Sequence, residues 1–241
     1  MNILKCLEFH IHGYYRFMFG DQNMSDKESY QRGLAFLERY GLLDDNYSQE
    51  CIPVMEKIFK LTDKDYFSFE RQSTTDLFRQ EFLLAAYFAS HIFDEHSIRA
   101  IQSICKFFNE EFIYIIESEK CVSDADLAVK LRIPVDTNWD DLMDGGCISD
   151  MLFASNNAFY IFGNSCQWGK WCDYDNSWSD YEIFGFKDYN KEVDHFLKEV
   201  GVSKNESDHT GMIPEALQQC FKNTVFKDRF WTNQVTESGS P

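Results

Sequence analysis

Residues 158–186 read AFYIFGNSCQWGKWCDYDNSWSDYEIFGF, and this stretch decides the fold. Short aromatic runs alternate here with Asn, Gly, Asp and Ser, which are residues typical of turns. Aromatic runs bounded by turn residues predict strands at about 158–162, 167–172 and 181–186, with a further strand at about 148–153. The gaps between the runs are too short for crossover helices, so we expect an antiparallel meander.

Helical spacing of apolar residues dominates the chain before Pro134. The predicted helices lie at about 30–40, 53–61, 76–88 and 98–108, followed by a short helix from Ser123 that ends before Pro134. The run Phe112–Ile116 fits a buried strand and a helix end equally well. After residue 190, two more helices are predicted, at about 193–200 and 214–221.

These elements predict an α+β fold with a helical N-terminal half, a small antiparallel meander and two C-terminal helices. We expect one domain over residues 1–241, with a helix-rich region at 1–135, a sheet-containing region at 136–190 and C-terminal helices within 191–231.

The compartment is predicted from the apolar segments and the cysteines. Charged residues and histidines interrupt the apolar start of the chain, so no signal-peptide core fits there. The longest apolar run, Phe82–Ala89, is much shorter than the roughly 20 residues of a membrane span. We therefore expect a soluble, cytoplasmic protein whose eight scattered cysteines are reduced small hydrophobic residues.

Charge is distributed unevenly along the chain. The 40 acidic and 23 basic residues give a net charge of -17, which excludes a non-specific nucleic-acid binder because such proteins need clustered Lys and Arg. Residues 136–194 hold twelve acids against three lysines, together with four of the five Trp residues. Aromatic anchors within a charged rim are typical of protein interfaces, and an acidic surface attracts a basic partner.

This coincidence of charge and Trp predicts a surface that binds a protein partner. The candidate residues are Asp140, Asp141, Asp144, Trp168, Trp171, Asp173, Asp175, Trp178, Asp180 and Glu182. The alternative is that the Trp residues fill the core of the sheet, and we expect one or two of them to remain at the surface.

One series of segments resembles the sheet region of bacterial immunity proteins that neutralise polymorphic toxins, including contact-dependent growth inhibition toxins. The series consists of Gly145-Gly146, Phe159–Ser165, Gln167–Trp171 and Tyr181–Lys187. The resemblance covers about residues 139–190. It implies a non-catalytic cytosolic protein that binds the toxic domain and occludes its active site. It transfers no individual binding residues, so the candidates above rest on charge and Trp alone. Our leading hypothesis is an immunity protein for a basic toxin, a nuclease, without a cofactor or metal.

Two other classes of function remain open. The chain lacks the P-loop, the dinucleotide fingerprint, the nucleophile elbow and the H-E-x-x-H and C-x-x-C motifs. The second class is a metal-dependent hydrolase in which His10 and His12 join a carboxylate of the Asp140, Asp141 and Asp144 group. The third class is a sugar- or peptide-binding module with Trp and Tyr side chains lining a groove.

Overall fold

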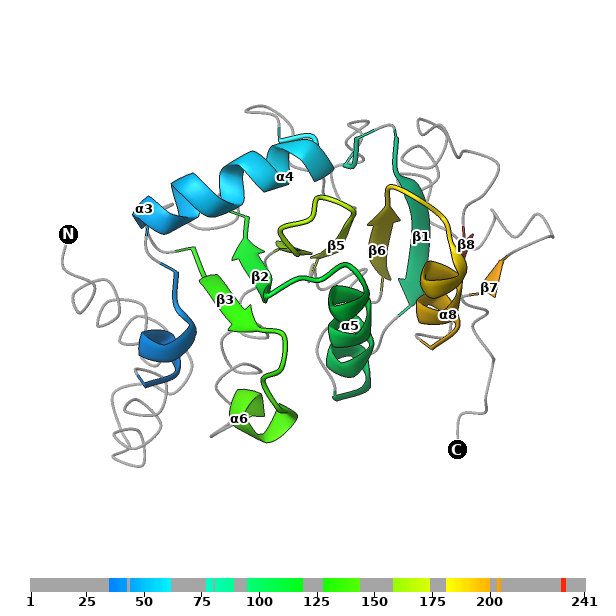
Figure 1. The fold of residues 1–241 in the computed structure, drawn as a ribbon. Helices are drawn as coiled ribbons and strands as arrows, with labels where there is room; N and C mark the ends of the chain where they lie inside the picture. The colour runs from blue at the N-terminus through cyan, green and yellow to red at the C-terminus, as the bar shows by residue number, and fades with distance from the viewer. Residues whose placement is uncertain are drawn as a thin grey trace, which may run out of the picture.

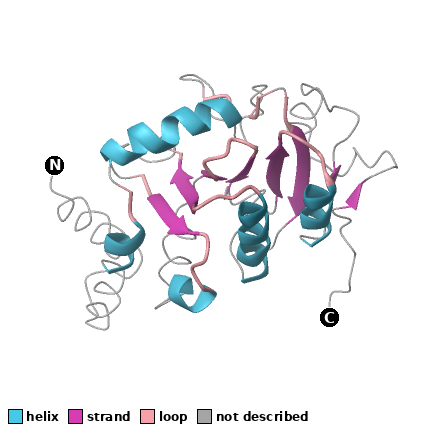
Figure 2. Ribbon diagram, viewed as in Figure 1, coloured by secondary structure: helices cyan, strands magenta, loops and turns pink. Residues whose placement is uncertain are grey.

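The described portion of the protein is built around an eight-stranded sheet (Figures 1 and 2). The structure is a computed structural model, and it describes residues 35–42, 44–61, 77–79, 81–88, 95–118, 128–143, 158–173, 181–199, 203–204 and 231–232. The strands are β1 (Leu83–Phe88), β2 (Phe112–Glu117), β3 (Lys130–Pro134), β4 (Ala158–Phe162), β5 (Trp168–Asp173), β6 (Tyr181–Phe186), β7 (Ser203–Lys204) and β8 (Trp231–Thr232).

The strand order is β3-β2-β4-β5-β6-β1-β8-β7. Neighbours from β3 to β1 pair antiparallel, β8 pairs parallel with β1, and β7 pairs antiparallel with β8. The predicted meander is confirmed in β4, β5 and β6, while the strand predicted at 148–153 lies outside the described residues.

Helices cover the sheet. Residues 35–40 are helical, and the other helices are α3 (Asp44–Asn46), the π-helical turn η2 (Tyr47–Cys51), α4 (Ile52–Ile58), α5 (Glu95–Phe107), α6 (Trp139–Met143) and α8 (Lys191–Glu199). The α+β class is therefore correct, and α8 confirms the first predicted C-terminal helix. The second, at 214–221, lies outside the described residues.

The region predicted as helical supplies three strands of the sheet. The helix predicted at 76–88 is wrong, because Leu83–Phe88 forms β1. The ambiguous run at 112–116 is a strand within β2, and the residues just before and including Pro134 form β3. The sequences of β1 and β2 are almost continuously apolar, as in strands buried on both faces, so they have no period of two to distinguish them from a buried helix. In β3, by contrast, buried and half-buried residues alternate.

Both faces of the sheet carry a hydrophobic core. On one face, which we call the α5 face, residues such as Ile115 and Ile161 pack against buried residues of α5 and α8. On the opposite face, the α4 face, Ile116 and Ile183 belong to the cluster that contains buried residues of α4. In Figure 1, α5 and α8 lie in front of the sheet, and α4 runs along the upper left of the view. The sheet is thus a middle layer between helices.

Two facing glycines allow the α4 face to pack directly on the sheet backbone. Gly169 of β5 and Gly185 of β6 are register partners. A Cβ atom at Gly169 would lie 2.7 Å from Cγ2 of Ile58, and one at Gly185 would lie 2.5 Å from the ring of Phe78. Because real Cβ atoms do not approach so closely, larger residues at these positions would displace the covering layer.

Gly185→Ala is expected to lower the free energy of unfolding by about 1–3 kcal/mol through overpacking. The measurement is urea unfolding followed by Trp fluorescence. Phe78→Leu removes the ring that the new methyl group would meet, so the double variant should be less destabilised than the two single variants added together. Strict additivity would contradict this packing.

Candidate functional site

The acidic segment 136–194 presents its described carboxylates mainly at α6 and at the start of α8. At α6, a turn follows β3, and the backbone N–H of Thr137 donates to the carbonyl of Pro134 at 3.0 Å. Asn138 then caps the helix: its Oδ1 accepts the backbone N–H of Asp141 at 2.7 Å, and its Nδ2 donates to Asp141 Oδ2 at 2.7 Å. This capping explains how so short a helix forms.

Packing fixes the orientation of α6. Leu142 is buried in the core of the α5 face, and Trp139 is half-buried against the same core. The side-chain amide of Gln102 in α5 donates to the carbonyl of Thr137 at 2.6 Å. These contacts leave Asp136 and Asp140 exposed.

We call Asp136, Asp140 and Asp141 the α6 patch. Asp141 is partly exposed, and its Oδ1 lies 3.9 Å from Nη1 of Arg39. An exposed pair at this distance is weak. The carboxylates of the α6 patch are therefore poorly compensated by nearby cations of the described chain.

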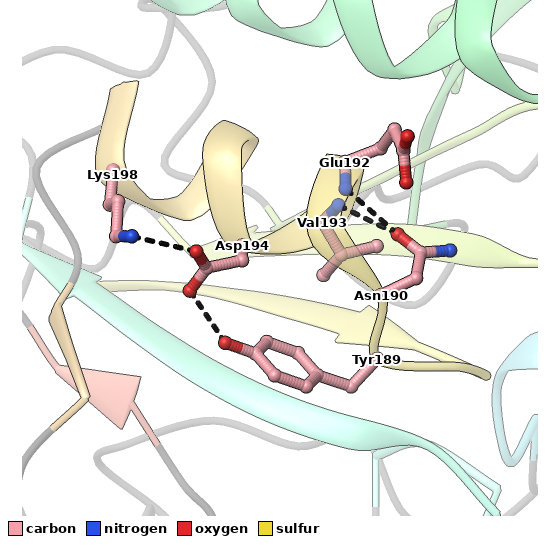
Figure 3. Close-up of polar contacts among 6 residues, drawn as sticks. All are labelled: Tyr189, Asn190, Glu192, Val193, Asp194 and Lys198. Carbon is pink, nitrogen blue, oxygen red and sulfur yellow. Dashed lines mark hydrogen bonds and ion pairs between the residues drawn. The ribbon is translucent and has the colours of Figure 1, made fainter.

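The acids of α8 are compensated. Asp194 accepts hydrogen bonds from Tyr189 Oη at 2.5 Å and from Lys198 Nζ at 2.7 Å (Figure 3). The hydrogen bond from Lys198, followed by that from Tyr189, holds the pKa of Asp194 below its usual value.

The start of α8 repeats the capping seen at α6, because Asn190 Oδ1 accepts the backbone N–H groups of Glu192 and Val193. The exposed acids Asp188 and Glu192 alternate with the exposed Lys187 and Lys191. This alternation leaves the surface around the start of α8 nearly neutral. Among the described side chains of the segment 136–194, the uncompensated carboxylates are therefore those of α6.

Trp168 and Trp171 do not lie at a surface, and their predicted role in binding a partner is wrong. Both side chains are fully buried, Trp168 on the α5 face and Trp171 on the α4 face. Positions three apart in a strand point to opposite faces, and helices or aromatic residues cover both faces of β5. Among the described Trp residues of the acidic segment, Trp139 is the one that keeps exposed surface.

For two of the remaining candidates the structure describes the backbone position, and the others lie outside the described residues. Asp173 pairs in register with Ala158, and Glu182 pairs with Cys172, so both lie at the same end of the sheet beside the connection 174–180. Asp144, Asp175, Trp178 and Asp180 lie outside the described residues, as do His10 and His12 of the hydrolase alternative.

Sequence reasoning missed a buried carboxylate, Glu110. Asn109 ends α5 in the left-handed conformation (φ 55°), and the backbone N–H of Glu110 donates back to the carbonyl of Cys105 at 2.9 Å. This C-terminal motif turns the chain from α5 toward the sheet. Glu110 itself is only 6% exposed.

The carboxylate of Glu110 holds the turn between β4 and β5. It accepts hydrogen bonds from the backbone N–H of Ser165 at 3.0 Å, from Ser165 Oγ at 2.5 Å and from Trp168 Nε1 at 3.3 Å. A Cβ atom at Gly163 would collide with this carboxylate, so the turn needs glycine there. Nothing in the pattern Asn109-Glu110-Glu111 distinguishes Glu110 from a solvated acid.

Burial raises the pKa of Glu110, and the hydrogen bonds from Ser165, Asn164 and Trp168 oppose the shift. Donors of the same chain occupy its oxygens, so the residue fits a structural role.

Within the ranges that the structure describes, no group of three His, Cys, Asp or Glu residues is arranged to hold a metal ion. None of the helices there has the length and apolar character of a membrane span.

No family model, no curated protein and no solved structure matches this chain.

The Glu110 site predicts a pH effect on stability. Folding raises the pKa of Glu110 above its ordinary value of about 4.5, so between that value and the raised pKa the native state binds more protons than the unfolded state. The free energy of unfolding therefore falls as the pH rises between these two pKa values. Glu110→Gln should remove this decline. The measurement is urea unfolding of wild type and variant at a series of pH values, with the exposed neighbour changed in Glu111→Gln as the charge-matched control. An equal effect of both variants would contradict the assignment.

Proposed function

We propose that this protein is an immunity protein, which binds the toxic domain of a bacterial polymorphic toxin and occludes its active site. The toxin domain is a basic nuclease in this proposal, and binding takes place in the cytoplasm. The observation that carries the proposal is the α6 patch: exposed carboxylates with little compensating charge, in the segment that holds more than half of the net charge of the chain.

A nuclease offers such a surface a matching target. Its substrate is a polyanion, so its cleft carries Lys and Arg side chains that neutralise phosphates. Carboxylates such as Asp136 and Asp140 can occupy the same positive field and exclude nucleic acid. Because opposite charges attract over a distance of about a Debye length, they also accelerate the first encounter.

The aromatic component of the interface differs from the one that the sequence predicted. Trp168 and Trp171 are used in the core, whereas Trp139 lies half-buried directly before Asp140. A half-buried Trp is already held in place by the core, so it loses little side-chain entropy when a partner covers it. We assign the anchoring role to Trp139.

The proposal predicts that the reading frame immediately upstream encodes a large secreted protein with a basic C-terminal domain, and this domain, purified separately, is the partner used in the test. Asp136→Asn combined with Asp140→Asn should slow association about threefold to tenfold and reduce its dependence on salt, because steering depends on local charge. The measurement is stopped-flow Trp fluorescence at several salt concentrations.

The control is Glu56→Gln combined with Glu81→Gln, which removes the same charge from exposed positions outside the acidic segment. Association of the control should stay close to wild type. If the domain does not bind at all, the immunity function is wrong; if both double variants behave alike, α6 is not the contact surface.

A further inference from the structure

Lys170 is a buried basic residue that the proposed function does not use. The residue lies in the middle of β5 and is fully buried. Trp168 and Cys172, two positions before and after it, belong to the core of the α5 face. Because side chains alternate along a strand, Lys170 lies on the same face. An ammonium group in such a core is stable only when a carboxylate or other acceptors compensate its charge.

The strand register identifies the position from which a carboxylate can reach Lys170. Its direct neighbours on β4 and β6 are Ile161 and Phe184, and its Nζ lies 5.3 Å from the centre of the Phe184 ring. Glu182 precedes Phe184 by two positions and is the register partner of Cys172. The Cα atoms of such diagonal neighbours are roughly 7–8 Å apart, a distance that long side chains can span.

Position 182 also lies on the same face of the sheet as Lys170. Phe184 and Phe186 of β6 belong to the core of the α5 face, so the alternation of the strand places position 182 on that face. Asp173, the other acid of these two strands, occupies a position that alternation places with Trp171 on the α4 face. Within β5 and β6, position 182 is therefore the acidic position that shares a face with Lys170.

We infer that Glu182 is the counter-ion of Lys170 and that this pair fixes the register of β5 against β6. The inference does not depend on the proposed function. A slip of one residue would move one of the two side chains to the opposite face and leave the other charge buried alone. Gly169 and Gly185 face each other on the same two strands, and the packing at these glycines requires the same register. Glu182, which the sequence predicts to bind a partner, is then an internal residue.

Glu182→Gln tests the position of this carboxylate. The variant leaves the Lys170 charge uncompensated in the core, so the midpoint of urea unfolding, followed by Trp fluorescence, should fall by about 1 M or more. Glu56→Gln is the matched control, because Glu56 is an exposed acid. Its midpoint should stay within about 0.2 M of wild type. Equal midpoints in the two variants would overturn the inference.

A double variant tests whether the two residues form a pair. Lys170→Met alone leaves a buried carboxylate without its cation, and adding Glu182→Gln should recover at least half of the lost urea midpoint. The control combines Lys170→Met with Glu117→Gln, since Glu117 is also a buried acid but accepts the backbone N–H of Val129 at 2.7 Å. This control should recover nothing.

If Lys170→Met does not fold alone, the two double variants are compared by whether each unfolds cooperatively. A cooperative transition in the double variant with Glu182→Gln, and its absence in the one with Glu117→Gln, is the expected result. Equal behaviour of the two double variants would overturn the pair.

A binding experiment separates this inference from the immunity function. Without denaturant, Glu182→Gln should associate with the upstream-encoded domain at a rate within about twofold of wild type, because an internal, paired carboxylate contributes little to steering. Slowing equal to that of Asp136→Asn combined with Asp140→Asn would place Glu182 at the contact surface and overturn the inference. If the domain does not bind, the immunity function is wrong, and the unfolding experiments still decide whether the pair exists.

Discussion

The central strands of the sheet bury side chains on both faces, and the other described features follow from this constraint. Trp168 and Trp171 lie three positions apart in β5 and fill the cores of opposite faces. Gly169 and Gly185 leave room for Ile58 and Phe78 to approach the backbone. Because the central strands need large apolar side chains on both faces, they account for much of the aromatic content of so acidic a chain.

The same constraint divides the charges into two kinds. Glu110 is a buried acid that joins the end of α5 to the turn after β4, and its oxygens are occupied by donors of that turn and of Trp168. The acids of α6 and α8 stay outside, since nothing in the core can accommodate them. Of these, the acids of α8 are balanced by nearby lysines, and those of α6 are not. The carboxylates available to a partner are therefore those that are neither buried in the core nor paired with a nearby cation.

The sequence predicted β4, β5 and β6 to within about one residue, because turn residues punctuate the aromatic runs. It also predicted the helical segments around α4, α5 and α8 from apolar spacing. It failed at β1, where a continuous apolar run carries no period, and this failure placed the sheet too late in the chain.

The candidate site was predicted incompletely. Asp140 lies exposed and Asp141 half-exposed on α6, as a charged surface requires. Trp168 and Trp171 are predicted at the surface because they coincide with the acidic segment, whereas packed residues cover both faces of β5. The role of Glu110 depends on a contact 55 residues away, with Ser165, and no local pattern records such a pairing.

The central claim is that α6, with its uncompensated carboxylates and its half-buried Trp139, is the surface that meets a basic partner. Hydrogen–deuterium exchange of the protein, free and with the upstream-encoded C-terminal domain, tests it most directly. The account predicts that amides in 136–143 become protected in the complex, while the strongly buried amides of β5 exchange as before. Protection confined to other segments, with 136–143 exchanging as in the free protein, would contradict it.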